Sequence, residues 1–185
     1  MSVVEEGKTA TITTEAAQEG EWRPKILAFT CRWCTYTGAD LAGLNRMKYP
    51  ADIRLLRVPC SGDVNPQYVL EALQRGCDGV IVCGCHPGDC HYATGNYYAK
   101  RRMMVFKREL EYIGLEPDRF QIRWISGAEA AKFRDTVTEF VGRITELGPI
   151  GGDFKLEQSL GAAHMGKGPK EVAPRKADAE EGGDQ

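Results

Sequence analysis

The chain has 185 residues and a mass of 20.5 kDa, enough for one ordinary domain and too little for two. Its formal net charge of −2 shows no bias towards nucleic acid or a membrane surface. With 42% hydrophobic residues and no apolar run as long as the roughly 18 residues of a membrane span, a packed core is expected. These features exclude a membrane-spanning, fibrous or multidomain protein, and they predict no nucleic-acid partner.

Composition divides the chain into three parts. Residues 24–148 contain most of the apolar sequence and predict one folded domain. Residues 1–23 form an acidic extension, and residues 149–185 form a polar tail rich in Gly and charged side chains. Both extensions have little apolar surface to bury, so we expect them to be flexible. The acidic start also lacks the apolar stretch of a secretory signal, which predicts a cytoplasmic protein.

The predicted domain alternates short apolar runs with helical patterns. Apolar runs predict four strands, at residues 25–30, 53–58, 79–82 and 120–125. Helical patterns follow each of them, at residues 38–47, 66–75, 96–113 and from a capping box at 126–129 to residue 147. Asn65 and Pro66 form an N-cap and first-turn pair ahead of the second helix.

This alternation predicts an α/β fold with helices on both faces of a parallel sheet. Right-handed crossovers favour a small flavodoxin-like sheet of four strands in the order 2-1-3-4. Ligands of such folds bind beyond the carboxyl ends of the strands, where the strand order reverses. Here that point lies between the first and third strands.

Seven cysteines, all within residues 31–90, are the informative feature of the sequence. An odd number without an export signal argues against a disulfide framework. Cys31, Cys60 and Cys85 stand just past the first three predicted strands, so they should share one edge of the sheet. The pairs Cys31/Cys34 and Cys85/Cys90 then converge from two sides of one crevice, with Cys60 somewhat further away on the neighbouring strand.

The spacing of these cysteines suits metal or redox chemistry. Two residues between Cys31 and Cys34 let both sulfurs face a tetrahedral metal, and the same spacing suits a redox pair. The second pair lies in GCHPGDCH, where Gly and Pro impose a tight loop whose N–H groups can face sulfur. A thiolate-ligated centre is therefore predicted. A thiol–disulfide oxidoreductase using Cys31 and Cys34, or a structural zinc module for assembly, remain alternatives.

Other conspicuous side chains have simpler explanations. Cys77 is predicted at the opposite end of the sheet, and Cys83 is predicted to be a small buried hydrophobe within a strand. His86 and His91 do not have the spacing of a Rieske centre, so we expect them to hydrogen-bond the loop. The basic run at residues 100–102 is either a solvated helix face or a docking patch for an acidic partner.

Three segments in order resemble the delta subunit of methyl-viologen-reducing hydrogenase: FTCRWCTYTGADLAG, RVPCSGDVNP and CGCHPGDCHYATGN. The resemblance extends from about Lys25 to Leu147, and GCHPGDCHY is its most specific motif. It implies one [2Fe-2S] cluster. It also implies that four of five cysteines ligate the cluster, with Cys60 the least certain of them: Cys31, Cys34, Cys60, Cys85 and Cys90.

The same resemblance implies an electron-transfer protein with no catalytic site of its own. Such a protein would relay electrons between a hydrogenase or formate dehydrogenase module and the flavin-bearing subunit of heterodisulfide reductase. The whole complex would couple two electron acceptors at the flavin by electron bifurcation.

Overall fold

The computed structural model describes residues 22–151, so the predicted extensions, apart from their innermost residues, lie outside the described part of the chain. The division at residues 23 and 149 therefore stays a prediction. Strands, helices and two short 3-10 turns follow one another in this order: β1 (Ile26–Cys31), α1 (Thr35–Leu44), β2 (Ile53–Val58), η1 (Ser61–Asp63), α2 (Pro66–Gln74), β3 (Gly79–Gly84), α3 (Gly95–Tyr112), η2 (Pro117–Arg119), β4 (Phe120–Trp124) and α4 (Ala130–Leu147).

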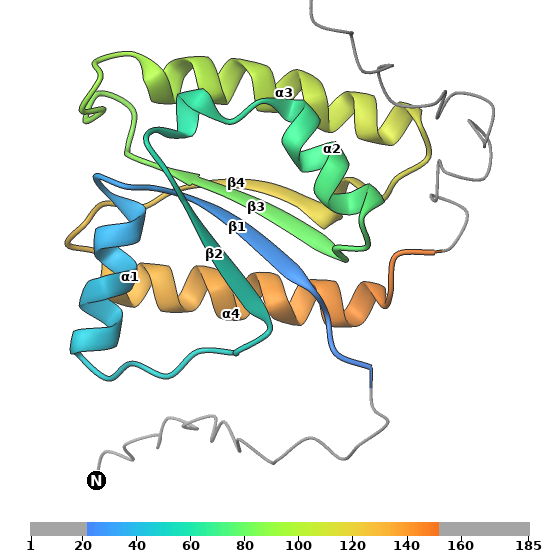
Figure 1. Cartoon of the computed structure of the whole chain (residues 1–185), viewed down its shortest axis with the longest axis horizontal. Coiled ribbons are helices and arrows are strands. Elements are labelled where there is room, and N and C mark those ends of the chain that lie inside the picture. Colours follow the sequence, from blue (N-terminus) through green and yellow to red (C-terminus); the bar gives the residue numbers. More distant parts are fainter. Residues whose placement is uncertain (1–21, 152–185) are drawn as a thin grey trace, which may run out of the picture. The chain divides into compact units, whose positions relative to one another are not determined.

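The four strands form one parallel sheet in the order β2-β1-β3-β4, which confirms the predicted α/β topology. Ile26 on β1 lies opposite Ile53 on β2 and Gly79 on β3, so these three strands start level with one another. Figure 1 shows α1 and α4 on one side of the sheet and α2 and α3 on the other. Since both faces are covered, β1 and β3 are buried almost throughout and consist of continuous apolar runs.

Two helices begin at other residues than the local sequence predicts. Helix α1 begins at Thr35, three residues before the predicted start, and its N-cap residue makes no side-chain capping bond. Helix α4 begins at Ala130, because only half of the predicted capping box forms. The Glu129 carboxylate accepts the N–H of Ser126 at 2.7 Å, but no side chain caps the helix in return. The predicted Asn65 cap is confirmed, since its side chain accepts a backbone N–H at the start of α2.

A buried arginine ties the end of α4 to the sheet. The Arg119 guanidinium, in a residue only 2% exposed, donates to the carbonyls of Gly148 at 2.9 Å, Leu147 at 3.4 Å and Asp78 at 3.1 Å. We expect Arg119→Ala to lower the free energy of unfolding by about 2–4 kcal/mol, since it removes a buried guanidinium and its hydrogen bonds to three backbone carbonyls. Urea unfolding followed by circular dichroism measures this. The exposed Arg134→Ala is the control, and an equal effect of both changes would contradict the role of Arg119.

Candidate metal centre

Three cysteines lie at the carboxyl ends of three neighbouring strands, as the topology predicts. Cys31 is the last residue of β1, Cys85 directly follows β3, and Cys60 lies two residues beyond β2 as the N-cap of η1. The strands end nearly level, since Cys31 pairs with Val58 and the residue before it pairs with Cys83. These three thiols therefore share the edge of the sheet formed by the carboxyl ends of the strands. The strand order reverses between β1 and β3, and ligands of such folds bind at that point.

Three sulfurs form the first group at this edge. Cys34 Sγ lies 3.1 Å from Cys85 Sγ, and Cys31 Sγ lies 3.9 Å from Cys85 Sγ. All three sulfurs lie within 4.8 Å of one another, and all three residues are buried. This group, built from both sides of the crevice, is close enough to bind one metal ion.

The other two predicted ligands form a second group. Cys60 Sγ lies 3.8 Å from Cys90 Sγ, and both residues are buried. We expected Cys90 to converge with Cys31, Cys34 and Cys85, and Cys60 to lie somewhat further off, but the sulfur of Cys90 lies beside that of Cys60. Burial, together with the neighbouring Cys90 and Cys31 thiols, raises the pKa of the Cys60 thiol to about 11. Cys60 lies beyond the carboxyl end of β2, so the second group lies at the same edge of the sheet as the first.

Close packing at two glycines brings the second group together. A Cβ on Gly62 would lie 2.6 Å from the carbonyl oxygen of Gly95, so η1 and the start of α3 meet backbone to backbone. A Cβ on Gly95 would overlap Cys60 Sγ and lie 3.2 Å from Cys90 Sγ. Sequence reasoning did not single out Gly95, although it lies inside the CGCHPGDCHYATGN segment.

Backbone N–H groups stabilise negative charge on a sulfur in each group. A hydrogen bond from the Cys34 thiol, with N–H groups of Trp33 and Cys34, lowers the pKa of Cys31 to about 5 against the effect of burial. Burial opposes ionisation of Cys90 as well, but N–H groups at the start of α3, including that of Asn96, outweigh it and lower its pKa. Since metals bind the thiolate form, both environments favour ligation.

The loop between Cys85 and Cys90 is fixed by side chains from two helices. His86 Nε2 lies 2.7 Å from a Glu129 carboxylate oxygen ahead of α4. The N–H of Ser126 and the His86 ring together lower the pKa of Glu129 to about 2, so it remains a carboxylate. The buried Asn96 amide of α3 donates to the carbonyls of Cys85 at 3.3 Å and His86 at 2.6 Å. These contacts position the loop that carries Cys85 and Cys90.

The two histidines differ in their contacts. The His86 ring hydrogen-bonds Glu129 and not its own loop as expected, whereas the His91 ring stacks on Trp33 with 3.7 Å between ring centroids. Tyr92 packs edge-on against His91, and its hydroxyl accepts a hydrogen bond from the Trp33 indole at 3.3 Å. This aromatic stack joins the loop after β1 to the loop after β3 across the mouth of the crevice.

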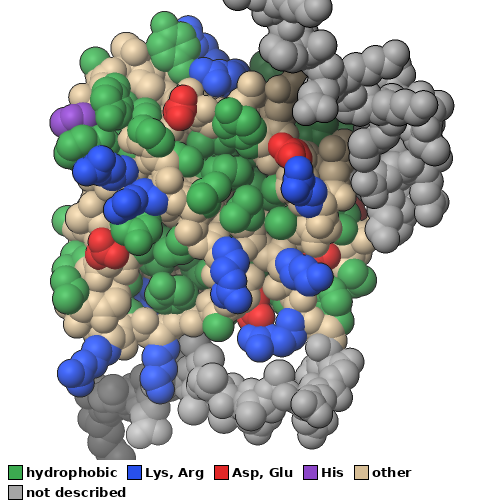
Figure 2. Space-filling view, viewed as in Figure 1, with side chains coloured by type: hydrophobic (Ala, Val, Ile, Leu, Met, Phe, Trp, Pro, Cys, Tyr) green, Lys and Arg blue, Asp and Glu red, His purple; other side chains and the backbone are tan. Residues whose placement is uncertain are grey.

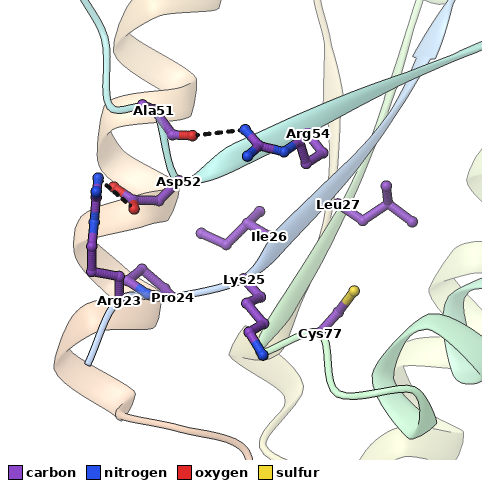
Figure 3. A pocket seen from close by; sticks show the side chains of 9 residues that line it. All are labelled: Arg23, Pro24, Lys25, Ile26, Leu27, Ala51, Asp52, Arg54 and Cys77. Atoms are coloured by element: carbon purple, nitrogen blue, oxygen red, sulfur yellow. Dashed lines mark hydrogen bonds and ion pairs between the residues drawn. The ribbon is translucent and has the colours of Figure 1, made fainter. Parts of the chain in front are cut away.

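The remaining two cysteines lie away from these sulfurs. Cys83 points into the core between the sheet and α4, and burial raises its pKa to about 12. Cys77 precedes β3 at the opposite end of the sheet, where it lines a hollow of about 540 Å³ (Figure 3). The ion pair of Arg23 and Asp52 closes part of the same hollow. Neither thiol joins the groups at the carboxyl ends of the strands.

Together, the fold and the site define a flavodoxin-like domain that carries a cluster of thiols suited to a metal centre. The chain belongs to the family of the methyl-viologen-reducing hydrogenase delta subunit, whose model matches residues 26–148. This match confirms the resemblance seen in the cysteine motifs.

Named relatives occur in two forms. An iron-sulfur subunit of the F420-non-reducing hydrogenase of Archaeoglobus profundus is 50% identical over 138 residues, which are 75% of this chain and 98% of the relative. A chain of the ferredoxin/F420H2-dependent CoB-CoM heterodisulfide reductase of Methanosarcina acetivorans is 49% identical over 143 residues, or 77% of this chain and 18% of the relative. A chain of the ferredoxin:CoB-CoM heterodisulfide reductase of Methanosarcina mazei is 50% identical over 134 residues, 72% and 17% of the two chains.

These relatives are an iron-sulfur subunit of a hydrogenase and two chains of heterodisulfide reductases. The chain spans nearly the whole of the hydrogenase relative but less than a fifth of either reductase relative. The same domain is thus found both as a segment of a larger chain and as a separate subunit.

Proposed function

We propose that this chain is an electron-transfer protein that carries one [2Fe-2S] cluster. The observation that carries the proposal is the gathering of five buried sulfurs at one edge of the sheet, in a group of three and a group of two. A [2Fe-2S] cluster takes four thiolates, two on each iron. Two thiolates about 2.3 Å from one tetrahedral metal lie roughly 3.8 Å apart. The Cys31–Cys85 and Cys60–Cys90 distances of 3.9 and 3.8 Å fit that spacing.

This grouping leads to a ligand assignment. Cys60 and Cys90 would hold one iron, and two of the three sulfurs of Cys31, Cys34 and Cys85 would hold the other. Cys60 is then a required ligand, and the spare thiol lies in the group of three. A single zinc ion on the group of three, or a redox pair of Cys31 and Cys34, would leave Cys60 and Cys90 without a role. About two irons per chain and no stoichiometric zinc is the expected metal content.

The cluster would relay electrons between two protein partners. We propose a hydrogenase or formate dehydrogenase module as donor and the flavin-bearing subunit of a heterodisulfide reductase as acceptor, in an electron-bifurcating complex. The support is that one relative is an iron-sulfur component of a hydrogenase and two others are heterodisulfide reductase chains. A single [2Fe-2S] centre exchanges one electron at a time, so it needs a donor and an acceptor close by. No catalytic residue is assigned to this chain.

Mixing the purified proteins without oxygen tests the relay. We expect no turnover by this chain alone, reduction of its cluster by hydrogen or formate once the donor module is added, and onward transfer once the flavin-bearing subunit is present. Cluster reduction is followed by visible absorbance and by the EPR signal of the reduced state. Equally fast electron transfer to the flavin-bearing subunit without this chain would disprove the relay.

The cytoplasm is the proposed compartment. All seven cysteines are unpaired, which suits a reducing environment. Within residues 22–151, none of the helices combines the length and the apolar character needed to cross a bilayer.

A further inference from the structure

Helix α3 is apolar on two opposite sides. Its inner side packs against the sheet through Ala99, Met103, Phe106 and Leu110, all of which are buried. Its outer side exposes five large side chains, each between 45% and 92% accessible: Tyr97, Tyr98, Met104, Val105 and Tyr112. Tyr97 and Met104 are two helical turns apart, as are Tyr98, Val105 and Tyr112 in succession, so the five side chains form a line along the helix. Packing within the domain explains why the inner side of α3 is apolar, but it does not explain why the outer side is.

Over most of its length, the charged side chains of this helix are all basic. Residues 95–108 include five basic side chains and no acidic one. Arg102 donates to the carbonyl of Gly62 at 3.0 Å, and Lys107 lies 3.8 Å from Asp118, so these two serve the fold. The Arg101 guanidinium instead lies over the exposed Tyr98 ring, 4.8 Å from its centroid. Cations in the first half of a helix gain nothing from the helix dipole, so helix stability does not account for Arg101.

Exposed aromatic and basic residues here surround a hollow. Its volume is about 460 Å³, and its lining comes from the N-cap and the first ten residues of α3: Thr94, Tyr97, Tyr98, Lys100, Arg101 and Met104. Thr94 directly precedes Gly95, whose backbone contacts the sulfurs of Cys60 and Cys90. A protein docked in this hollow would therefore come close to the second group of thiols. Short distances between centres are what electron transfer requires.

The composition of this surface is typical of a protein interface. Tyr, Met and Arg are enriched in interfaces, whereas Asp and Glu are depleted from them. A contiguous patch of exposed apolar residues is also typical of a site at which a protein binds a partner. Figure 2 shows basic side chains interspersed among apolar ones over the visible face of the molecule. A partner for such a surface needs apolar contacts and carboxylates to meet Arg101 and Lys100.

We propose that the outer side of α3, defined by Tyr97, Tyr98, Arg101, Met104 and Val105 and here called the α3 face, docks an acidic surface of the flavin-bearing subunit of heterodisulfide reductase. This inference rests on the proposed function. A line of exposed apolar side chains suits a lasting contact more than a transient encounter. Two relatives carry this domain within a much longer heterodisulfide reductase chain, so a lasting neighbour from that enzyme fits the α3 face.

The test measures binding of the full-length, cluster-loaded chain to the flavin-bearing heterodisulfide reductase subunit of the same organism. Tyr98→Ala combined with Arg101→Ala is expected to raise Kd at least tenfold, because it removes an aromatic and an arginine from the centre of the α3 face. Leu44→Ala combined with Arg134→Ala, on α1 and α4 across the sheet, should change Kd less than twofold. Unchanged iron content and visible absorbance show that each variant keeps its cluster.

The outcomes separate this inference from the relay itself. Tight binding by the wild type and equally tight binding by the Tyr98→Ala/Arg101→Ala variant would overturn the α3 face and leave the relay standing. If the variant loses binding to the donor module but keeps binding to the flavin-bearing subunit, the assignment of the partner is wrong. Failure of the wild type to bind the flavin-bearing subunit would overturn both the inference and the proposed acceptor.

Discussion

A Cys60→Ser variant purified without oxygen is expected to lose most of its iron. Cys60 and Cys90 are the two sulfurs of the second group, 3.8 Å apart, so removing one would leave a single thiolate for the iron that we propose there. A serine oxygen is a harder and much less acidic ligand than a thiolate. Because loss of an outer partner of a ligand already costs about 10–100-fold in metal affinity, loss of the ligand itself should cost more than about 100-fold. Iron analysis and the EPR spectrum of the reduced protein measure this.

Cys77→Ser is the matched control for this change. Cys77 lies at the opposite end of the sheet, near Lys25, and its substitution should keep the full iron content (Figure 3). A complete cluster with an unchanged spectrum in Cys60→Ser would mean that the other four cysteines suffice. The assignment of one iron to the second group would then be wrong.

Topology could be predicted from the sequence because several independent signals agree. The runs of β1 and β3 are apolar throughout, as befits strands covered on both faces, and Asn65 with Pro66 marks the start of α2. The start of α1 could not be predicted, because Cys34 offers no capping side chain. The Thr35 hydroxyl instead donates to the carbonyl of Ile125, 90 residues further along the chain. A tertiary contact of this kind leaves no local pattern.

Among the cysteines, too, some contacts follow from topology and others depend on tertiary packing. Their positions after successive strands were enough to predict that Cys31, Cys34 and Cys85 converge, because strand ends are fixed by topology. The contact of Cys60 with Cys90 depends on a turn that no pattern specified. The Gly62 N–H donates to Cys60 Sγ at 3.4 Å, which folds η1 back towards α3. Only the three-dimensional packing of two distant glycines then sets the distance between the sulfurs.

Gly95→Ala is expected to disrupt the cluster, although alanine is normally the better residue in a helix. Gly95 is the first residue of α3, and a Cβ there would overlap Cys60 Sγ and approach Cys90 Sγ to 3.2 Å. Relief of the clash requires either that Cys60 Sγ turns away from Cys90 or that η1 and α3 separate, a shift that typically costs about 1–3 kcal/mol in a packed interior. The separation also moves the N–H groups at the start of α3 away from Cys90. Iron content, visible absorbance and thermal stability of the holoprotein should all fall.

Gly142→Ala supplies the control, because the same substitution there meets open space. Gly142 lies inside α4, and a Cβ on it would have no atom within 4 Å. Alanine should stabilise that helix by about 0.5–1 kcal/mol relative to glycine. The two substitutions therefore predict changes of opposite sign in stability from the same added methyl group. Should Gly95→Ala retain its iron and gain stability as Gly142→Ala does, α3 does not press against the sulfurs, and the proposed pairing of Cys60 with Cys90 on one iron would lose its structural basis.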